Sequence, residues 1–319
     1  MILMSRPRCV ALGAALLVLA ACSSPPGRTS SATVPPGERL RVVASFYPLQ
    51  FIAERIGGDR VTVTSLTKAG AEPHDLELSP RDVATLAEAD LVVHLGGFQP
   101  AVDTAVAAEA PGRAFDAAGP ADLDLRITAG GATVSGTIDG AADAVGATDP
   151  HFWLDPVRLK AVAVALAERM SAVDPTAASA FATNLAALTR DLGALDADLR
   201  AGLADCASGE LVTSHSAFGY LARRYGLTQV GVTGLTPDAE PDAGQLADVA
   251  AFVRAHAVRT IYSETLASPA VADTLARETG ARTAVLDPVE GLTDASAGSD
   301  YLAVMRANLA TIRRGQPCR

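Results

Sequence analysis

The sequence lacks the features that mark several functional classes. Lysine and arginine number 26 against 36 aspartates and glutamates, which gives a net charge of −10 at pH 7, and no basic stripe stands out. A nucleic-acid partner is therefore not expected. The chain has no His-Glu-x-x-His and no Gly-x-Ser-x-Gly segment, the patterns of zinc proteases and serine hydrolases. Its N-terminal apolar run, Val10–Leu19, is too short to span a bilayer.

The N-terminal apolar run predicts export. Arginines precede it and small residues follow, as in a secretory signal. It ends in Leu-Ala-Ala-Cys, which resembles a bacterial lipobox, so we predict a signal peptide over 1–21 and lipidation of Cys22 at the outer face of the cytoplasmic membrane. The alternative is a plain signal peptide followed by a chance cysteine. The segment 22–39 is rich in Ser, Pro, Gly and Thr, which predicts a flexible stalk.

Cysteine is scarce, with four in 319 residues. Cys9 would leave with the signal peptide and Cys22 would carry the lipid, which leaves Cys206 and Cys318 in the folded part. Two cysteines outside the cytosol form one disulfide in the simplest case. That bond would pin the C-terminus to the start of the second half of the chain. The alternative is that Cys318 stays a free thiol.

Short apolar and β-branched runs alternate with helix patterns after the stalk, which is typical of α/β architecture with mainly parallel sheets. The predicted strands are 40–46, 61–67, 90–95 and 114–116 in the first half and 210–214, 229–232, 260–263 and 283–286 in the second. Helices are predicted to begin near Pro48, Pro80, Pro100 and Pro156, and again near Ala217, Asp242, Pro269 and Ser299. Two similar, Rossmann-like lobes are therefore expected.

A long apolar stripe joins the two lobes. Asp174 and Pro175 supply an N-cap and a proline at the first helical position. Apolar side chains then recur at steps of three and four residues: Phe181, Leu185, Leu188, Leu192, Leu195, Leu199 and Leu203. We predict one long rigid helix over 174–205, between an N-terminal lobe over 40–173 and a C-terminal lobe over 206–319.

Three histidines and an aspartate fall where these elements end. His74 lies on a loop after a first-lobe strand, His151 lies just before the helix near Pro156, and His215 and Asp287 end second-lobe strands. Ligands bind at the carboxyl edge of open α/β sheets, so we expect all four in a cleft between the lobes. Three imidazoles and a carboxylate fill the tetrahedral shell of zinc and leave no position for an activated water. The set predicts metal holding, whereas a zinc hydrolase would need an open position.

The remaining polar candidates carry competing interpretations. His94, inside Leu-Val-Val-His-Leu, is expected to be a core residue, and His256 to end a helix where its charge suits the helix dipole. Glu72 is either a spare carboxylate near the first histidine or an ordinary polar loop residue. Glu264, at a strand end, either braces a ligand imidazole or caps the next helix.

Four motifs resemble those of the cluster A-I solute-binding lipoproteins, the zinc and manganese receptors of ABC importers. They are Gly70–Asp75 with Ser79 and Pro80, Pro150–Pro156, Ser214–Leu221, and Leu286–Pro288 followed by Tyr301, Leu302, Met305 and Asn308. The resemblance covers nearly everything from Leu40 onward. It implies two α/β lobes joined by a single long helix, with one divalent ion held between them by His74, His151, His215 and Asp287.

The resemblance also implies partners and a preferred metal. Family members deliver their ion to a membrane permease driven by a cytoplasmic ATPase, so we expect a monomeric, lipid-anchored receptor. A histidine at position 215 resembles the zinc receptors, because manganese receptors commonly carry glutamate there; manganese or iron stays an alternative. Many zinc receptors have a histidine-rich loop before the second ligand, but 122–149 contains no histidine, and we expect a mobile flap. Besides the metal receptor and the zinc hydrolase, a third possible class is an adhesin that keeps a structural zinc.

Overall fold

The computed structural model describes residues 38–126 and 146–319. The predicted signal peptide, the lipidation site Cys22 and nearly all of the predicted stalk lie outside these ranges, as does most of the predicted flap over 122–149. Among the described residues, no helix is long and apolar enough to cross a membrane.

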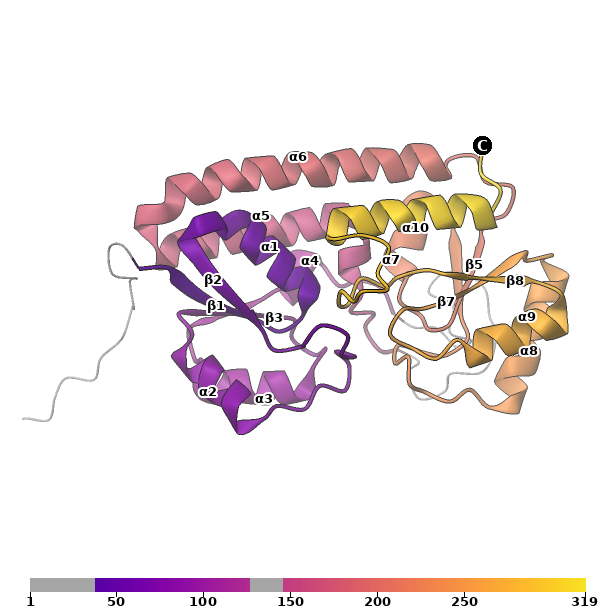
Figure 1. The fold of residues 1–319 in the computed structure, drawn as a ribbon, viewed down its shortest axis with the longest axis horizontal. Coiled ribbons are helices and arrows are strands. Elements are labelled where there is room, and N and C mark those ends of the chain that lie inside the picture. The colour runs from indigo at the N-terminus through magenta and orange to yellow at the C-terminus, as the bar shows by residue number, and fades with distance from the viewer. Residues whose placement is uncertain (1–37, 127–145) are drawn as a thin grey trace, which may run out of the picture. The chain divides into compact units, whose positions relative to one another are not determined.

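The first lobe is built on a four-stranded parallel sheet. The strands are β1 (Leu40–Ala44), β2 (Val61–Ser65), β3 (Leu91–His94) and β4 (Ala114–Asp116), in the order β2-β1-β3-β4. The helices are α1 (Tyr47–Gly57), α2 (Pro80–Glu88), α3 (Pro100–Glu109) and α4 (Ala118–Ala121). Because strand side chains alternate, Val42 packs in one core with α1 and Val43 in another with α2 and α3. Figure 1 shows these helices on opposite faces of the sheet.

The second lobe repeats this plan. Its strands are β5 (Glu210–Thr213), β6 (Thr228–Gly231), β7 (Thr260–Ser263) and β8 (Arg282–Val285), all parallel and in the order β6-β5-β7-β8. The helices are α7 (Gly219–Tyr225), α8 (Ala243–Ala255), α9 (Ala270–Thr279) and α10 (Tyr301–Gly315). In both sheets the first strand of the lobe lies between the second and the third. The predicted strands are confirmed to within about two residues at their ends.

Two consecutive helices connect the sheets (Figure 1). α5 (Pro156–Val173) is capped by the side chain of Asp155, and α6 (Ala178–Leu203) follows a short 3-10 turn, Pro175–Ala177, that Asp174 caps. The predicted stripe is buried along α6, apart from the partly buried Leu185. α6 packs on α1 and α5 from the first lobe and on α10 from the second, which confirms the predicted long helix in contact with both lobes.

The predicted disulfide joins Cys206 to Cys318. It closes a separation of 112 residues and lies where the last residues run beside the start of the second lobe. Backbone bonds support the same contact, because the Arg319 amide donates to the Asp205 carbonyl at 2.8 Å. Both cysteines lie near the amino-terminal end of β5, whereas His215 follows the carboxyl end of that strand.

Replacing both cysteines with serine should destabilise the fold without affecting the histidines. The chain-entropy model predicts that closing a loop of about 100 residues contributes about 4.7 kcal/mol to the free energy of unfolding, and the loss is typically about 2–4 kcal/mol. Urea unfolding of the double variant, beside zinc titration of the same sample, measures both effects. Two free thiols per unfolded, non-reduced chain that starts after Cys22 would contradict the bond itself.

Candidate metal centre

The three predicted histidines meet at one point with a glutamate. Nε2 of His151 lies 3.3 Å from Nε2 of His74 and 3.4 Å from Nε2 of His215. Oε1 of Glu290 lies 3.4, 3.3 and 3.7 Å from the Nε2 atoms of His74, His151 and His215, respectively. Ligand atoms at about 2.0–2.1 Å from a tetrahedral zinc stand about 3.3 Å apart. Five of the six separations between the donor atoms are close to this value, and all four atoms lie within 4.8 Å of one another, so the group fits a single small cation.

Each lobe brings two of the four side chains. His74 lies on the loop between β2 and α2, and His151 immediately precedes the 3-10 turn Phe152–Leu154 that leads into α5. His215 follows β5 by two residues, and Glu290 lies on the loop after β8. Three of the loops follow the carboxyl ends of parallel strands, the edge at which α/β sheets bind ligands.

The group is almost fully withdrawn from solvent. The side chains of His151 and His215 are 0% exposed, that of Glu290 is 1% exposed and that of His74 is 8% exposed. In the described part of the chain, Oε2 of Glu290 has no hydrogen-bond partner. The Phe98 ring packs edge-on against His74, with centroids 4.7 Å apart. A buried carboxylate oxygen without a partner is costly unless a cation is bound, so the donor set suits a metal ion.

His74 connects the buried group to the outside. It lines a hollow of about 520 Å³ together with Gly97, Phe98, Pro150 and Thr236. The other two histidines and Glu290 do not line this hollow. An ion that enters by this route would meet His74 first.

Two carboxylates orient two of the imidazoles from behind. Nδ1 of His151 lies 2.8 Å from Oδ1 of Asp149, which also accepts the His151 backbone N–H at 2.9 Å. Nδ1 of His215 lies 2.5 Å from Oε2 of Glu264, whose Oε1 accepts the His215 backbone N–H at 2.9 Å. A carboxylate at Nδ1 holds the proton there and turns the Nε2 lone pair toward a metal. Glu264 thus braces an imidazole, the first of its two predicted roles.

The carboxylates also set the charge of the group. Burial alone would lower the pKa of His215, but Glu264 and Glu290 outweigh burial and raise the pKa of His215 well above its usual range. In the same way Asp149 and Glu290 overcome burial and raise the pKa of His151. Burial dominates at His74 and lowers its pKa. Glu290 is buried, yet hydrogen bonds with the three histidines hold its pKa well below the usual range.

Glu72 lies beside the group, and its carboxylate accepts a hydrogen bond from the backbone. Its Oε1 accepts the His74 N–H at 2.9 Å and lies 3.9 Å from Nε2 of His74. Burial and the charge of Glu290 raise the pKa of Glu72 to about 7. These contacts describe a loop carboxylate that shapes the turn before His74 and lies within ion-pair distance of its imidazole.

Asp287, the expected fourth donor, is not in the group, and Glu290 lies with the three histidines in its place. Oδ1 of Asp287 accepts the Val289 N–H at 2.8 Å, and its side chain lines a different hollow together with Glu264 and Asn308. The chain turns at Val289, whose φ is +58°, and this turn brings Glu290 to the histidines. The left-handed backbone conformation is rare for a β-branched residue, so the sequence pattern gave no sign of the turn.

Sequence reasoning missed two acidic residues, Glu290 and Asp149. Each stands close to a motif that was recognised: Asp149 is two residues before His151, and Glu290 is three residues after Asp287. An acidic residue two positions before a candidate ligand histidine is a usable signal, because its carboxylate can reach both Nδ1 and the backbone N–H of that histidine, as Asp149 does.

The two other histidines are structural, as predicted. His94 ends β3 at 8% exposure, and its Nδ1 lies 3.2 Å from Oδ1 of Asp103. His256 follows α8 as its C-cap, stacks on Phe252 and lies 3.6 Å from Glu210. Neither belongs to the donor group.

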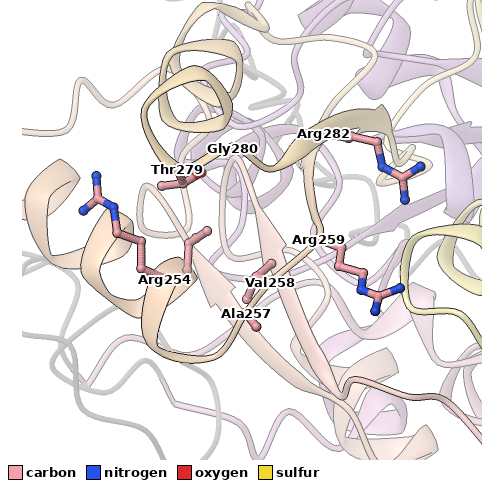
Figure 2. Close-up of a pocket in the computed structure, with 8 residues that line it drawn as sticks. Arg254, Ala257, Val258, Arg259, Thr279, Gly280 and Arg282 are labelled. Atoms are coloured by element: carbon pink, nitrogen blue, oxygen red, sulfur yellow. The ribbon is translucent and has the colours of Figure 1, made fainter.

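A third hollow, of about 540 Å³, has a different chemistry (Figure 2). It lies where α8 and α9 end, and its charged lining residues are Arg254, Arg259 and Arg282. Arg254 donates to the carbonyl of Glu278 in the last turn of α9. Cations are favourable at helix C-termini, which accounts for arginine here. With no carboxylate, imidazole or thiol in its lining, this hollow offers no set of metal ligands.

Comparisons with known proteins agree with this geometry. Residues 42–315 match the family described as zinc-uptake complex component A, periplasmic. The zinc-binding lipoprotein AdcA of Streptococcus pneumoniae serotype 4 is 36% identical over 284 residues, which cover 86% of this chain and 56% of AdcA. The high-affinity zinc uptake system protein ZnuA of Bacillus subtilis is 34% identical over 305 residues, 95% of each chain.

Solved structures point the same way. The crystal structure of the Zn(II)-bound ZnuA-like domain of S. pneumoniae AdcA superposes with a TM-score of 0.71 at 34% identity, covering 87% of this chain and 99% of that one. The chain spans about half the length of the AdcA relatives, 56%, but nearly all of the B. subtilis protein. On the extent of these matches, the chain belongs to the family of periplasmic zinc-uptake components.

Proposed function

We propose that this protein captures one divalent metal ion outside the cytoplasm and delivers it to an ABC importer. The observation that carries the proposal is the buried convergence of His74, His151, His215 and Glu290, with neighbouring donor atoms 3.3 to 3.7 Å apart. Burying four titratable side chains costs free energy unless a cation is bound among them. A role in stabilising the fold alone therefore does not account for the group.

Zinc is the metal that this donor set fits best. Three imidazole nitrogens and one carboxylate oxygen match a tetrahedral zinc site. Manganese and magnesium favour octahedral sites with six ligands, most of them oxygen atoms. Family members whose names state a metal, AdcA and ZnuA, are called zinc-binding or zinc-uptake proteins. Manganese and iron are the competitors against which selectivity should be measured.

The geometry favours holding the ion over using it in catalysis. A catalytic zinc keeps one position for water, and here four protein donors surround one point. We infer that the protein is a receptor and not a hydrolase. The ion is cargo, and the hollow beside His74 is its route in and out.

The proposed partners follow from the family. A receptor of this kind hands its ion to a membrane permease with a cytoplasmic ATPase, and S. pneumoniae AdcA is named a lipoprotein. We propose that Cys22 carries the lipid anchor on the extracytoplasmic side and that the receptor acts as a monomer. Mass spectrometry of the membrane-extracted protein would detect a diacylated N-terminal Cys22.

A pair of matched variants tests which carboxylate binds the ion. Glu290→Gln removes the charge of the proposed donor, and Asp287→Asn removes that of the expected one three residues away. Because partners behind the ligands already contribute about 10- to 100-fold to affinity, loss of the negative charge of the donor should weaken zinc by at least about that factor. Asp287→Asn should change the Kd by less than about tenfold. Competition titration with a chromophoric chelator measures the zinc Kd of both variants. A larger loss of affinity in Asp287→Asn than in Glu290→Gln would show that Asp287 is the fourth donor.

A further inference from the structure

The loop that carries Glu290 is anchored at two successive carbonyls. The side-chain amide of Asn308, on α10, closes a ring with the backbone of Asp287: the Asp287 N–H donates to Oδ1 of Asn308 at 3.0 Å, and Nδ2 of Asn308 donates to the Asp287 carbonyl at 2.7 Å. Asn308 is 3% exposed, so water cannot readily replace either bond.

The second anchor comes from the segment that carries His151. Nε1 of Trp153 donates to the Pro288 carbonyl at 2.8 Å, and the Trp153 carbonyl accepts from the Tyr301 hydroxyl at 2.5 Å. Trp153 and Tyr301 are both fully buried. Trp153 is two residues from His151, and Pro288 is two residues from Glu290. The bond between them therefore fixes the loop that carries Glu290 relative to the segment that carries His151.

Between these anchors and Glu290 lies a turn in a strained backbone conformation. Val289 is fully buried at φ +58°, a backbone conformation that is unfavourable for a β-branched residue. Such a conformation persists only where the surrounding structure fixes it. The Val289 N–H donates to the Asp287 side chain of the same loop, and the carbonyls of Asp287 and Pro288 are the points at which Asn308 and Trp153 hold this loop.

We propose that Asn308 and Trp153 are positioning residues that hold the Val289 turn and thereby place the Glu290 carboxylate against the three histidines. The inference rests on the proposed metal-receptor function and adds the residues that control its fourth donor. Without either anchor, Val289 relaxes to negative φ and the carboxylate moves out of reach. A site of three histidines remains, which binds the ion more weakly and releases it faster.

The first test removes the Asn308 bonds while keeping its volume. Asn308→Leu should weaken zinc and accelerate its transfer to excess chelator by about 10- to 100-fold, the range for residues that act behind a ligand. Gln316→Met is the matched control, because Gln316 is also a buried amide on the C-terminal helix end and donates to the Glu210 carbonyl at 2.8 Å, away from the donor loop. Gln316→Met should leave both quantities unchanged.

A double-variant cycle separates positioning from general destabilisation. If Asn308 acts through Glu290, then Asn308→Leu has no further effect on zinc affinity once Glu290→Gln is present. Bound Co²⁺ gives an independent signature, because the visible spectrum of Asn308→Leu should resemble that of Glu290→Gln and differ from that of the parent. Additive losses of affinity in the double variant, or a parental spectrum in Asn308→Leu, overturn the proposal.

Trp153→Phe provides the same cycle if Asn308→Leu fails to fold, since it keeps an aromatic ring beside His151 and removes the indole N–H that forms the second anchor. Failure of the inference is distinct from failure of the proposed function. A parent chain that binds no zinc refutes the receptor function itself, whereas a parent that binds zinc and an Asn308→Leu variant with the same affinity and release rate refutes the anchoring alone.

Discussion

Replacing His215 with alanine is expected to weaken zinc binding by more than about 100-fold, because residues that only brace a ligand already contribute about 10- to 100-fold. His215 supplies one of three nitrogens, and its Nε2 faces both His151 and Glu290. The change removes a donor, opens a coordination position and deprives Oε2 of the buried Glu264 of its partner Nδ1, which lies 2.5 Å away in the parent. Calorimetric titration with zinc measures the loss directly.

His94→Ala and His256→Ala serve as controls for this change. Both remove an imidazole, but His94 contacts Asp103 and His256 contacts Phe252 and Glu210, away from the donor group. Their zinc affinities should stay within about twofold of the parent. A His215→Ala variant that binds like the parent would show that the constellation is wrong. A zinc-dependent turnover of model esters by the parent would favour the hydrolase alternative.

The three histidines could be predicted because each lies on a loop next to an element that the sequence pattern also predicts. A parallel strand must end at the ligand-binding edge of its sheet, and β5 is a buried run that ends two residues before His215. The prolines before His74 and His151 mark loops that break the helix and strand patterns. The period of the apolar stripe on α6 likewise predicted a long helix, because burial of one face is what makes that helix stable.

The fourth donor could not be predicted because it depends on a turn that no local pattern specifies. Asp287 and Glu290 are carboxylates three residues apart after the same strand, and both are buried. Which of them faces the histidines is decided by the sign of φ at Val289 and by anchors from Trp153 and Asn308. Those two residues are 155 positions apart in the chain. The choice between the two carboxylates therefore depends on tertiary contacts. Composition and periodicity carry none of it.

Zinc binding at neutral pH should release protons, and this is the second large effect that we expect. The pKa of His215 is raised well above 6.5 and that of His151 is also raised, so the metal-free group holds protons that zinc must displace from Nε2. Each proton released makes the apparent Kd rise about tenfold for every unit by which pH falls, and two make it rise about a hundredfold. His74, whose pKa is lowered, adds to the slope only under more acidic conditions.

The same pKa shifts make the stability of the metal-free protein depend on pH. His215 has a raised pKa in the folded state, so its contribution to stability is complete below about 6.5 and is lost as pH rises through the folded pKa. Glu290 has a lowered pKa, so its contribution is present above about 4.3 and is lost as pH falls through the folded pKa. Raising the pH therefore weakens the empty fold while it strengthens zinc binding, and the gain in thermal stability on adding zinc should grow with pH.

Calorimetry at pH 7 in buffers of different ionisation enthalpy counts the protons released per zinc. We expect about one or more for the parent, because Glu264 and Glu290 raise the pKa of His215 in the empty group. Glu264→Gln is the informative variant: it retains all four proposed donors but removes the charge beside Nδ1, so the pKa of His215 falls and fewer protons are released at the same pH. Its affinity should depend less steeply on pH between neutral and alkaline conditions. A parent that releases no protons at pH 7 would show that the empty group is already deprotonated, and that the carboxylates behind the imidazoles orient the donors without charging them.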